Sequence, residues 1–302
     1  MSDTVIINEV GPRDGLQSQA QHLELAGRQR FIEALLAASL RHVEIGSFVS
    51  PRAVPQMAGT GELAQALGKP EGADFTALVP NMKGYELARE AGLQTVAVVV
   101  SATETMNQKN INMSLADTMA VARQVMEQGA RDGIGVQAYL AVAFECPFEG
   151  LVSPDVVLDL GGQLLTAGAQ ELVIADTIGA ANPAQVKHLM GSFVDEHGAP
   201  QLACHFHDTR ALGLANIYAA LETGVRRFDA SVGGLGGCPF APGAKGNVAT
   251  EDVVMLCEQM GFATGVDMAA LLEVVDLISE LLGSPQGGRA HYWLSRQVAQ
   301  AA

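Results

Sequence analysis

The sequence has few cysteines, few basic residues and no long apolar run. Its four cysteines, at positions 146, 204, 238 and 257, are widely spaced and form no Cys-x-x-Cys pair. This pattern predicts reduced thiols in a cytoplasmic protein rather than a disulfide framework. No stretch reaches 18 uninterrupted apolar residues, and the first four residues lead directly into a strand pattern, so neither a membrane span nor a signal or transit peptide is expected.

Positive charge is also scarce. The chain carries 18 Lys and Arg residues against 33 Asp and Glu residues, which gives a formal net charge of −15. Such a balance argues against nucleic acid and against an anionic membrane surface as partners. An anionic small molecule would therefore need positive charge placed locally in its binding site.

Short apolar runs alternate with longer amphipathic runs along the whole chain. This alternation, with 48% hydrophobic and 17% charged residues, predicts a buried parallel sheet wrapped in helices. The expected strands are residues 5–10, 41–45, 75–79, 95–100, 136–142, 171–175, 201–207 and 227–232. The expected helices include residues 24–39, 60–67, 82–91 and 114–132, with further helices opening near residues 154, 183 and 211.

Eight strand–helix units in about 260 residues predict a (β/α)₈ TIM barrel. We expect one catalytic domain over residues 1–302, with the barrel over about 4–262, an additional C-terminal helix over about 267–283 and a loose tail over 284–302. A doubly wound open sheet is the alternative. It lacks support because no Gly-x-Gly-x-x-Gly follows the first strand and no phosphate-binding Gly-x-x-x-x-Gly-Lys-Ser/Thr motif occurs.

Two histidines close the seventh predicted strand, within CHFHD at residues 204–208. Alternate residues of a strand point to one face, so His205 and His207 should project together, roughly 6–7 Å apart. Two neutral imidazoles placed in this way can bind one divalent metal ion. The alternative is that one histidine caps the strand end and the other faces solvent.

Polar residues also follow other predicted strands, at the barrel end where catalytic groups gather. They are Arg13, Asp14, Glu44, Ser47, Asp176, Thr177 and Asp208, with Asn247 in a glycine-rich loop over residues 233–247. Each has a structural alternative: Asp14 and Asp176 suit turns, and Asn247 suits the cap of the following helix. Oxygen ligands from Asp14 and Asn247 added to the two imidazoles would suit Mg²⁺ or Mn²⁺ better than zinc.

Several motifs together resemble those of the 3-hydroxy-3-methylglutaryl-CoA lyase family, over roughly residues 4 to 283. These motifs are GPRDGLQ (11–17), SFVSP (47–51), VPQM (54–57), KNIN (109–112), DTIG (176–179), CHFHDT (204–209), GLGGCP (234–239) and GNVATED (246–252). The family belongs to a superfamily of metal-dependent barrel lyases and Claisen-type synthases. The resemblance implies retro-Claisen cleavage of an acyl-CoA to acetyl-CoA and a keto acid, which is acetoacetate for the parent substrate.

The resemblance also implies roles for individual residues. The implied metal ligands are Asp14, His205, His207 and Asn247; the catalytic residues are Arg13, Cys238, Glu44 and Asp176; and the substrate-binding residues are Gln17, Ser47, Lys109, Asn110 and Thr177. Arg210 is a further predicted substrate-binding residue, although it does not come from the family pattern. The chemistry needs these types, because a metal lowers the pKa of the substrate's tertiary hydroxyl, a cation such as Arg13 holds the developing enolate oxygen, and an acid such as Cys238 protonates the enolate carbon.

The chain departs from the family pattern at two cations. Arg210 and Ala211 follow the His-Asp-Thr sequence where the usual lyase has Tyr-Gly, and Lys245 replaces a small residue. These cations could meet a different substrate carboxylate or the CoA phosphates, which leaves the acyl group open. The alternatives are a related 3-hydroxyacyl-CoA lyase, a synthase running the Claisen reaction forward, and a catalytically silent CoA-binding protein. A cytoplasmic homo-oligomer, dimer or tetramer, is expected.

Overall fold

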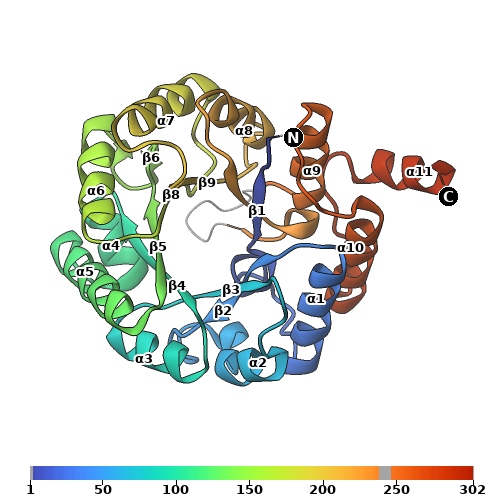
Figure 1. The fold of residues 1–302 in the computed structure, drawn as a ribbon, viewed down its shortest axis with the longest axis horizontal. Coiled ribbons are helices and arrows are strands. Elements are labelled where there is room, and N and C mark those ends of the chain that lie inside the picture. The colour runs from blue at the N-terminus through green and yellow to red at the C-terminus, as the bar shows by residue number, and fades with distance from the viewer. Residues whose placement is uncertain (1–2, 238–245, 302) are drawn as a thin grey trace.

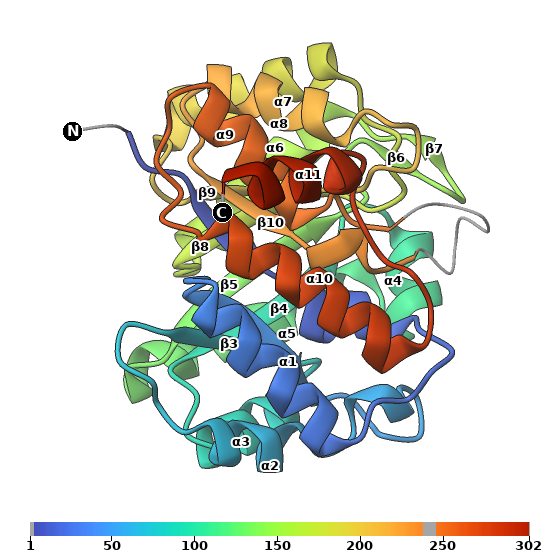
Figure 2. The same cartoon turned by 90° about the vertical axis from the view of Figure 1, so that its right-hand side faces the viewer.

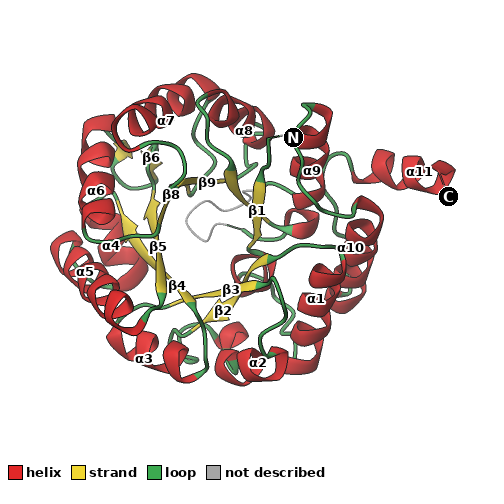
Figure 3. Cartoon of the chain, in the orientation of Figure 1, coloured by secondary structure: helices red, strands yellow, loops and turns green. Residues whose placement is uncertain are grey.

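The computed structural model describes residues 3–237 and 246–301. Eight parallel strands close into a barrel in the order β1-β10-β9-β8-β5-β4-β3-β2, and the helices surround it (Figure 1, Figure 3). The predicted (β/α)₈ barrel is confirmed. The barrel strands are β1 (Ile6–Glu9), β2 (His42–Ser47), β3 (Asp74–Leu78), β4 (Thr95–Ser101), β5 (Gly135–Ala141), β8 (Glu171–Asp176), β9 (Leu202–Phe206) and β10 (Arg227–Ala230).

Helices cover the outside of this barrel. They are α1 (Leu25–Ala37), α2 (Thr60–Leu67), α3 (Met82–Glu90), α4 (Glu104–Ile111), α5 (Leu115–Asp132), α6 (Pro154–Thr166), α7 (Pro183–His197), α8 (Gly213–Glu222), α9 (Thr250–Gln259), α10 (Met268–Leu282) and α11 (His291–Ala301). Short helical turns η1 (Gly11–Gly15), η2 (Pro55–Met57) and η3 (Val232–Gly234) and a small hairpin of β6 (Glu145–Cys146) and β7 (Gly150–Leu151) complete the described chain. None of the described helices is long and apolar enough to cross a membrane.

Capping residues start several helices where the sequence predicts. The Ser114 hydroxyl accepts a hydrogen bond from the backbone N–H of Asp117 at the start of α5. Asn182 and Gln185 form a reciprocal capping box at the start of α7, and Pro183 occupies its first turn. These local signals fix where the helices begin, and hence where the loops at the strand ends are held.

Apolar side chains pack on both faces of the sheet. The outer layer between sheet and helices contains Phe31, Phe193 and Phe228, all fully buried. A smaller cluster fills the barrel interior and comprises Ala97, Tyr139, Val173 and Ala203. Strands buried on both faces explain the nearly continuous apolar runs in the sequence.

The helix α4, over residues 104–111, is not among the helices expected from the sequence. The buried Asn107 amide donates to the carbonyls of Ser101 and Thr103, both at 2.8 Å, and accepts from the Ser101 N–H at 3.0 Å. These bonds hold the first turn of α4 against the end of β4. Asn112 then ends the helix in the left-handed conformation, with φ 54°.

The predicted C-terminal helix is confirmed as α10, which packs beside α1 outside the barrel (Figure 2). The expectation of a loose tail over 284–302 is wrong for residues 291–301, which form α11. The Asp252 carboxylate accepts the backbone N–H groups of Arg289 and Ala290, at 2.7 and 2.9 Å, and Glu251 accepts that of Gly288 at 2.7 Å. Two carboxylates at the start of α9 therefore anchor the chain that leads into α11.

Candidate active site

Arg13 and Asp14 lie in η1, immediately after β1. The backbone N–H groups of Arg13, Asp14 and Gly15 all point to the Val10 carbonyl, at 2.8–3.2 Å. Pro12 stands in the first turn of η1, where its missing N–H costs nothing. This tight turn holds both charged side chains at the carboxyl end of the barrel.

Asp14, His205 and His207 converge on one point, with one ligand atom of each lying within 4.8 Å of the others. The two imidazole rings are 5.2 Å apart, centre to centre, because the strand alternation turns Phe206 into the core between them. The alternative in which one histidine faces solvent is wrong, since the two residues are only 6% and 5% exposed. Three predicted metal ligands are thus brought together from opposite ends of the chain.

Asn247, the fourth predicted ligand, joins this group. Its side-chain N–H groups donate to Asp14 Oδ2 at 2.8 Å and to the Leu235 carbonyl at 2.9 Å. The alternative that Asn247 caps α9 is wrong, because the N-cap residue of α9 is Ala249 and no side chain caps it. Asn247 Oδ1 and His207 Nδ1 are buried and lack a hydrogen-bond partner among the described residues. Buried acceptors left over beside a carboxylate and a second imidazole suit a divalent ion.

Asp229, for which the sequence analysis gave no role, stands behind His205. Its Oδ2 lies 2.9 Å from His205 Nδ1, and its Oδ1 accepts from the Asn8 amide at 2.9 Å. Burial lowers the pKa of His205, but Asp229 outweighs it, and the net pKa is raised. Because Asp229 contacts Nδ1, it turns the other ring nitrogen of His205 toward Asp14, as carboxylates behind metal-binding histidines do. The sequence signal that could have identified Asp229 was a carboxylate inside an otherwise apolar strand.

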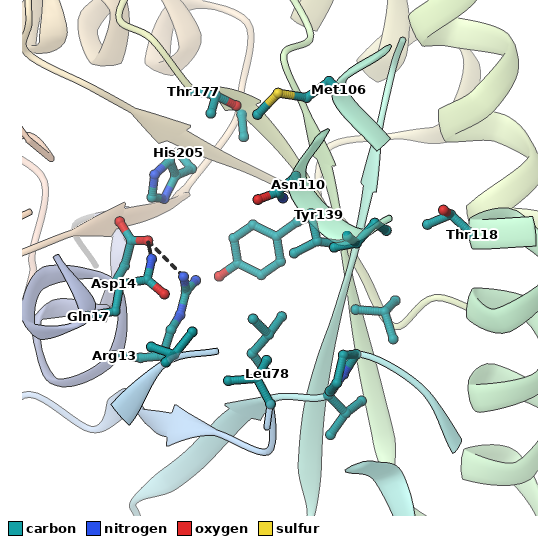
Figure 4. Close-up of a pocket in the computed structure, with 18 of the residues that line it drawn as sticks. Arg13, Asp14, Gln17, Leu78, Met106, Asn110, Thr118, Tyr139, Thr177 and His205 are labelled. Atoms are coloured by element: carbon teal, nitrogen blue, oxygen red, sulfur yellow. Dashed lines mark hydrogen bonds and ion pairs between the residues drawn. The ribbon is translucent and has the colours of Figure 1, made fainter. Parts of the chain in front are cut away.

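Arg13 is held by two carboxylates. Its Nε lies 2.7 Å from Glu44 Oε2. Its Nη1 lies 2.7 Å from Asp14 Oδ1 (Figure 4). Burial raises the pKa of Glu44 to about 7, although Arg13 offsets part of the rise. Burial also acts to raise the pKa of Asp14, but Arg13 and the two histidines outweigh it and lower the pKa to about 2. Asp14 is therefore an anion throughout the neutral range, as a metal ligand must be.

A cavity of about 260 Å³ opens beside these groups. Its lining includes the predicted Arg13, Asp14, Gln17, Asn110, Thr177, His205 and His207, together with Tyr139, which sequence reasoning missed. Gln17 donates to Asp14 Oδ1 at 2.7 Å and so also holds the carboxylate of this predicted metal ligand. Thr177 Oγ1 accepts from the Val142 N–H at 2.8 Å. Figure 4 shows His205, Arg13 and Asp14 facing Tyr139 across this space.

Asp176 and Arg210 hold one loop instead of facing the cavity. The two oxygens of Asp176 accept the N–H groups of Ala180 and Ala181, at 2.8 and 3.0 Å. The Arg210 guanidinium donates to the carbonyls of Gly179, Ala180 and Ala181. Burial raises the pKa of Asp176 to about 6, and these N–H groups offset part of the rise. Asp176 therefore has the turn role given as its alternative, and the guanidinium of Arg210 holds the same loop through its backbone carbonyls.

Ser47 and Lys109 also lie outside the cavity lining. Ser47 is buried, and its hydroxyl accepts from the Val49 N–H at 3.2 Å. Lys109 is exposed on α4. Cys238 and Lys245 lie outside the described residues, so the roles expected for them stay predictions.

A (β/α)₈ barrel with a candidate metal centre, a buried arginine and an adjoining cavity at the carboxyl ends of its strands has the architecture of a metal-dependent barrel enzyme. Residues 4–278 match the family model described as HMGL-like. The chain belongs to this family, and it is a carbon–carbon lyase.

Relatives of the chain are similar over nearly their whole length. The hydroxymethylglutaryl-CoA lyase of Pseudomonas mevalonii is 43% identical over 296 residues, which cover 98% of each chain. The 3-hydroxy-3-isohexenylglutaryl-CoA/hydroxy-methylglutaryl-CoA lyase of Pseudomonas aeruginosa is 43% identical and covers 93% of this chain and 94% of its own. The crystal structure of hydroxymethylglutaryl-CoA lyase from Pseudomonas aeruginosa superposes with a TM-score of 0.94 at 41% identity, covering 98% of this chain and 99% of that one.

Proposed function

We propose that the substrate is a thioester like 3-hydroxy-3-methylglutaryl-CoA, and that retro-Claisen cleavage releases acetyl-CoA and a keto acid, acetoacetate for that substrate. The observation that carries the proposal is the convergence of Asp14, His205 and His207 within 4.8 Å, beside Arg13 on the wall of a cavity. The substrate named for the Pseudomonas mevalonii relative supports the choice of acyl-CoA.

A divalent ion, Mg²⁺ or Mn²⁺, would be held by Asp14, His205, His207 and Asn247. Two oxygen ligands and two imidazoles favour these ions over zinc, which recruits more nitrogen or sulfur. When bound, such an ion lowers the pKa of a coordinated hydroxyl and fixes the geometry of the oxygens that it binds. Asp229 keeps His205 in the tautomer that such binding requires, through the 2.9 Å contact at Nδ1.

Arg13 stabilises the charge that develops on the thioester side. The tertiary hydroxyl loses its proton to solvent and becomes the carbonyl oxygen of the keto acid; as the carbon–carbon bond breaks, its electron pair passes to the thioester side and forms an enolate. A guanidinium fixed in advance by Glu44 and Asp14, each at 2.7 Å, stabilises the enolate oxygen without having to reorganise. In this proposal the catalytic contribution of Glu44 is to hold Arg13, and that of Asp176 is to hold the loop through Ala181.

Cys238 protonates the enolate carbon in this proposal and so completes acetyl-CoA. A thiol with the ordinary pKa near 8.5 is mostly protonated at neutral pH, which is the form that a proton donor needs. We expect Cys238→Ala to bind metal and substrate like the parent and to lose kcat. Full activity in that variant would remove the thiol from the reaction.

An assay of acetyl-CoA release tests the reaction. The enzyme is incubated with 3-hydroxy-3-methylglutaryl-CoA and with other 3-hydroxyacyl-CoA esters, with Mg²⁺, with Mn²⁺ and with chelator. We expect metal-dependent release of acetyl-CoA and acetoacetate from the first substrate. Cleavage of another ester alone would reassign the acyl group. Condensation of acetyl-CoA with a 2-keto acid, without cleavage of any ester, would identify a synthase and overturn the proposal.

The enzyme is further proposed to act in the cytoplasm as a homo-oligomer, dimer or tetramer. The described cysteines, Cys146, Cys204 and Cys257, are buried free thiols, which is typical of a reducing compartment. Light scattering coupled to size-exclusion chromatography measures the assembly, and a monomer at micromolar concentration would contradict this part of the proposal.

A further inference from the structure

The cavity has a second, apolar part that the metal centre does not explain. It lies between the ends of β3 and β4 and the helices α4 and α5, and we call it the β4 arm. It is lined by Val79, Val98, Met106, Ile111, Val121 and Ala122. Figure 4 shows this direction of the cavity, with Arg13 and Asp14 on one side, Tyr139 in the middle and Thr118 of α5 on the far side.

The alternation of side chains along β4 explains how one cavity reaches both the barrel interior and the helices α4 and α5. Val99 packs with the cluster inside the barrel, so its neighbour Val98 points outward to the helices. Both residues line the cavity. The space therefore continues past β4 from the barrel interior to the inner faces of α4 and α5.

The described lining of the β4 arm carries no charged side chain. The charged and titratable residues of the cavity lining, Arg13, Asp14, His205, His207 and the phenol Tyr139, all belong to the barrel interior and the metal centre. The Thr118 hydroxyl is already engaged, because it donates to the Ser114 carbonyl at 2.8 Å. A phosphate or a second carboxylate would find no cationic partner there, whereas a hydrocarbon group would lose no hydrogen bonds.

The deep walls of the β4 arm lie in the core of the molecule. Val98, Met106 and Ala122 are only 3%, 1% and 1% exposed. The pantetheine chain of a CoA thioester carries two amides and must lead out to a charged nucleotide in water, so it cannot end among these residues. A substituent on the carbon that bears the hydroxyl starts beside the metal centre and can end in a closed apolar space.

We propose that the β4 arm binds the apolar substituent at C3 of the substrate and that this lyase accepts substituents longer than methyl, such as unbranched or branched chains of four to six carbons. This inference rests on the proposed function, because it takes the hydroxyl at C3 to lie at the metal centre. Val121 and Met113, both partly exposed at the cavity wall, then limit the length that is accepted.

Cleavage kinetics provide the first test. The ratio of kcat/KM for a 3-butyl substrate to that for the 3-methyl substrate is measured in the parent, in Val121→Phe and in Met113→Phe. We expect a parent ratio above about 0.1 and a fall of at least about 30-fold in both variants, since each methylene in an apolar pocket contributes about fourfold. Val156→Phe, the same change at an exposed position of α6, should leave the ratio unchanged.

Binding of the free 3-hydroxy-3-alkylglutarates to the Mn²⁺-loaded enzyme, measured by calorimetry, separates this inference from the proposed function. These diacids contain no thioester to cleave. Affinity that rises with alkyl length in the parent and stays flat in Met113→Phe supports the β4 arm even if no thioester is cleaved. If the 3-methyl substrate is cleaved but affinity does not depend on alkyl length, the role inferred for the β4 arm is wrong and the proposed function stands. KM values that rise equally for both substrates in Val121→Phe would assign the arm to pantetheine and overturn the inference.

Discussion

Arg13 illustrates how much of the proposed chemistry depends on the shape of one side chain. Its planar guanidinium contacts Glu44 through Nε and Asp14 through Nη1, both at 2.7 Å. A lysine ammonium is a point charge on a flexible chain and cannot reproduce both contacts while facing the cavity. The fixed fork, more than the positive charge alone, therefore prepares the site for an enolate.

We expect Arg13→Lys to lower kcat at least about 10²-fold, the scale for losing one donor to a transition state, while KM changes little. Steady-state kinetics on 3-hydroxy-3-methylglutaryl-CoA measure both parameters. Arg30→Lys, at an exposed position of α1, is the matched control and should behave like the parent. A near-parental kcat in Arg13→Lys would leave Arg13 with a structural role.

Asp229 lies behind His205, one of the predicted metal ligands. Asp229→Asn keeps the shape but removes the charge that faces His205 Nδ1 at 2.9 Å. We expect Mn²⁺ affinity, measured by calorimetry, to fall about 10- to 100-fold, the usual effect of losing such a partner. Asp195→Asn, at an exposed position of α7, should leave the affinity unchanged. Equal affinities in parent and Asp229→Asn would show that His205 needs no orienting partner.

Side chains that gather at the strand ends were predictable, and contacts to the backbone of a loop were not. Asp14 and His207 follow strands and His205 lies in one, and the apolar runs of these strands are plain in the sequence, so barrel geometry brings the three residues together. Asp176 is the last residue of β8, but its partners are the backbone N–H groups of Ala180 and Ala181. Those groups are invisible in a sequence, because every residue carries them and only the folded loop aims them.

Among the elements, β1 is tied to the start of α9 by a buried carboxylate. Glu9 accepts the N–H groups of Gly11 and Val232, at 2.9 and 3.0 Å, and contacts the Thr250 hydroxyl at 2.5 Å. Burial raises the pKa of Glu9 from 4.5 to about 7; these hydrogen bonds offset part of the rise, and the nearby Glu251 carboxylate adds to it. Folding therefore favours the protonated form of Glu9.

The sign of the resulting pH dependence follows from linkage. Because the folded pKa lies above the unfolded one, the stability contributed by Glu9 is complete below about pH 4.5 and is lost as the pH rises through about 7. We expect the Tm of the parent to fall more between pH 5 and pH 8 than that of Glu9→Gln, by roughly 3 °C or more. Calorimetric scans of both proteins at the two pH values measure this difference. Parallel Tm profiles would mean that Glu9 stays ionised in the fold.

One of the helices that the sequence did not predict, α11, depends on contacts from a distant segment. Residues 288–290, which lead into α11, are held by the Glu251 and Asp252 carboxylates at the start of α9. The Arg289 side chain also pairs with Asp208. Local signals were weak, because Tyr292 and Trp293 are exposed and Leu294 alone is buried among residues 291–300. By contrast, α10 has a long buried apolar face and was predictable.

In the whole molecule, the candidate metal centre lies across the place where the barrel closes. β1 pairs with β10 in a parallel register, so the first strand meets the last. Asp14 follows β1, His205 and His207 belong to or follow β9, and Asn247 follows β10. The chain order of eight strands made the barrel predictable, and closure of the barrel is what brings the N-terminal and C-terminal ligands within reach of each other.

A bound ion should therefore stabilise the whole fold. A ligand at 100 times its Kd adds about 2.7 kcal/mol to the free energy of unfolding, which corresponds to roughly 5 °C in Tm for a domain of this size. We expect Mn²⁺ to raise the Tm of the chelator-treated parent by about that amount, followed by calorimetry. The same Mn²⁺ concentration should shift His207→Ala much less, because the ion loses a ligand and with it most of its affinity. His188→Ala removes an exposed imidazole on α7 and should keep the parental shift, which controls for adventitious binding to surface histidines. Equal shifts in all three proteins would place the ion away from His207 and would overturn the assignment of the metal centre.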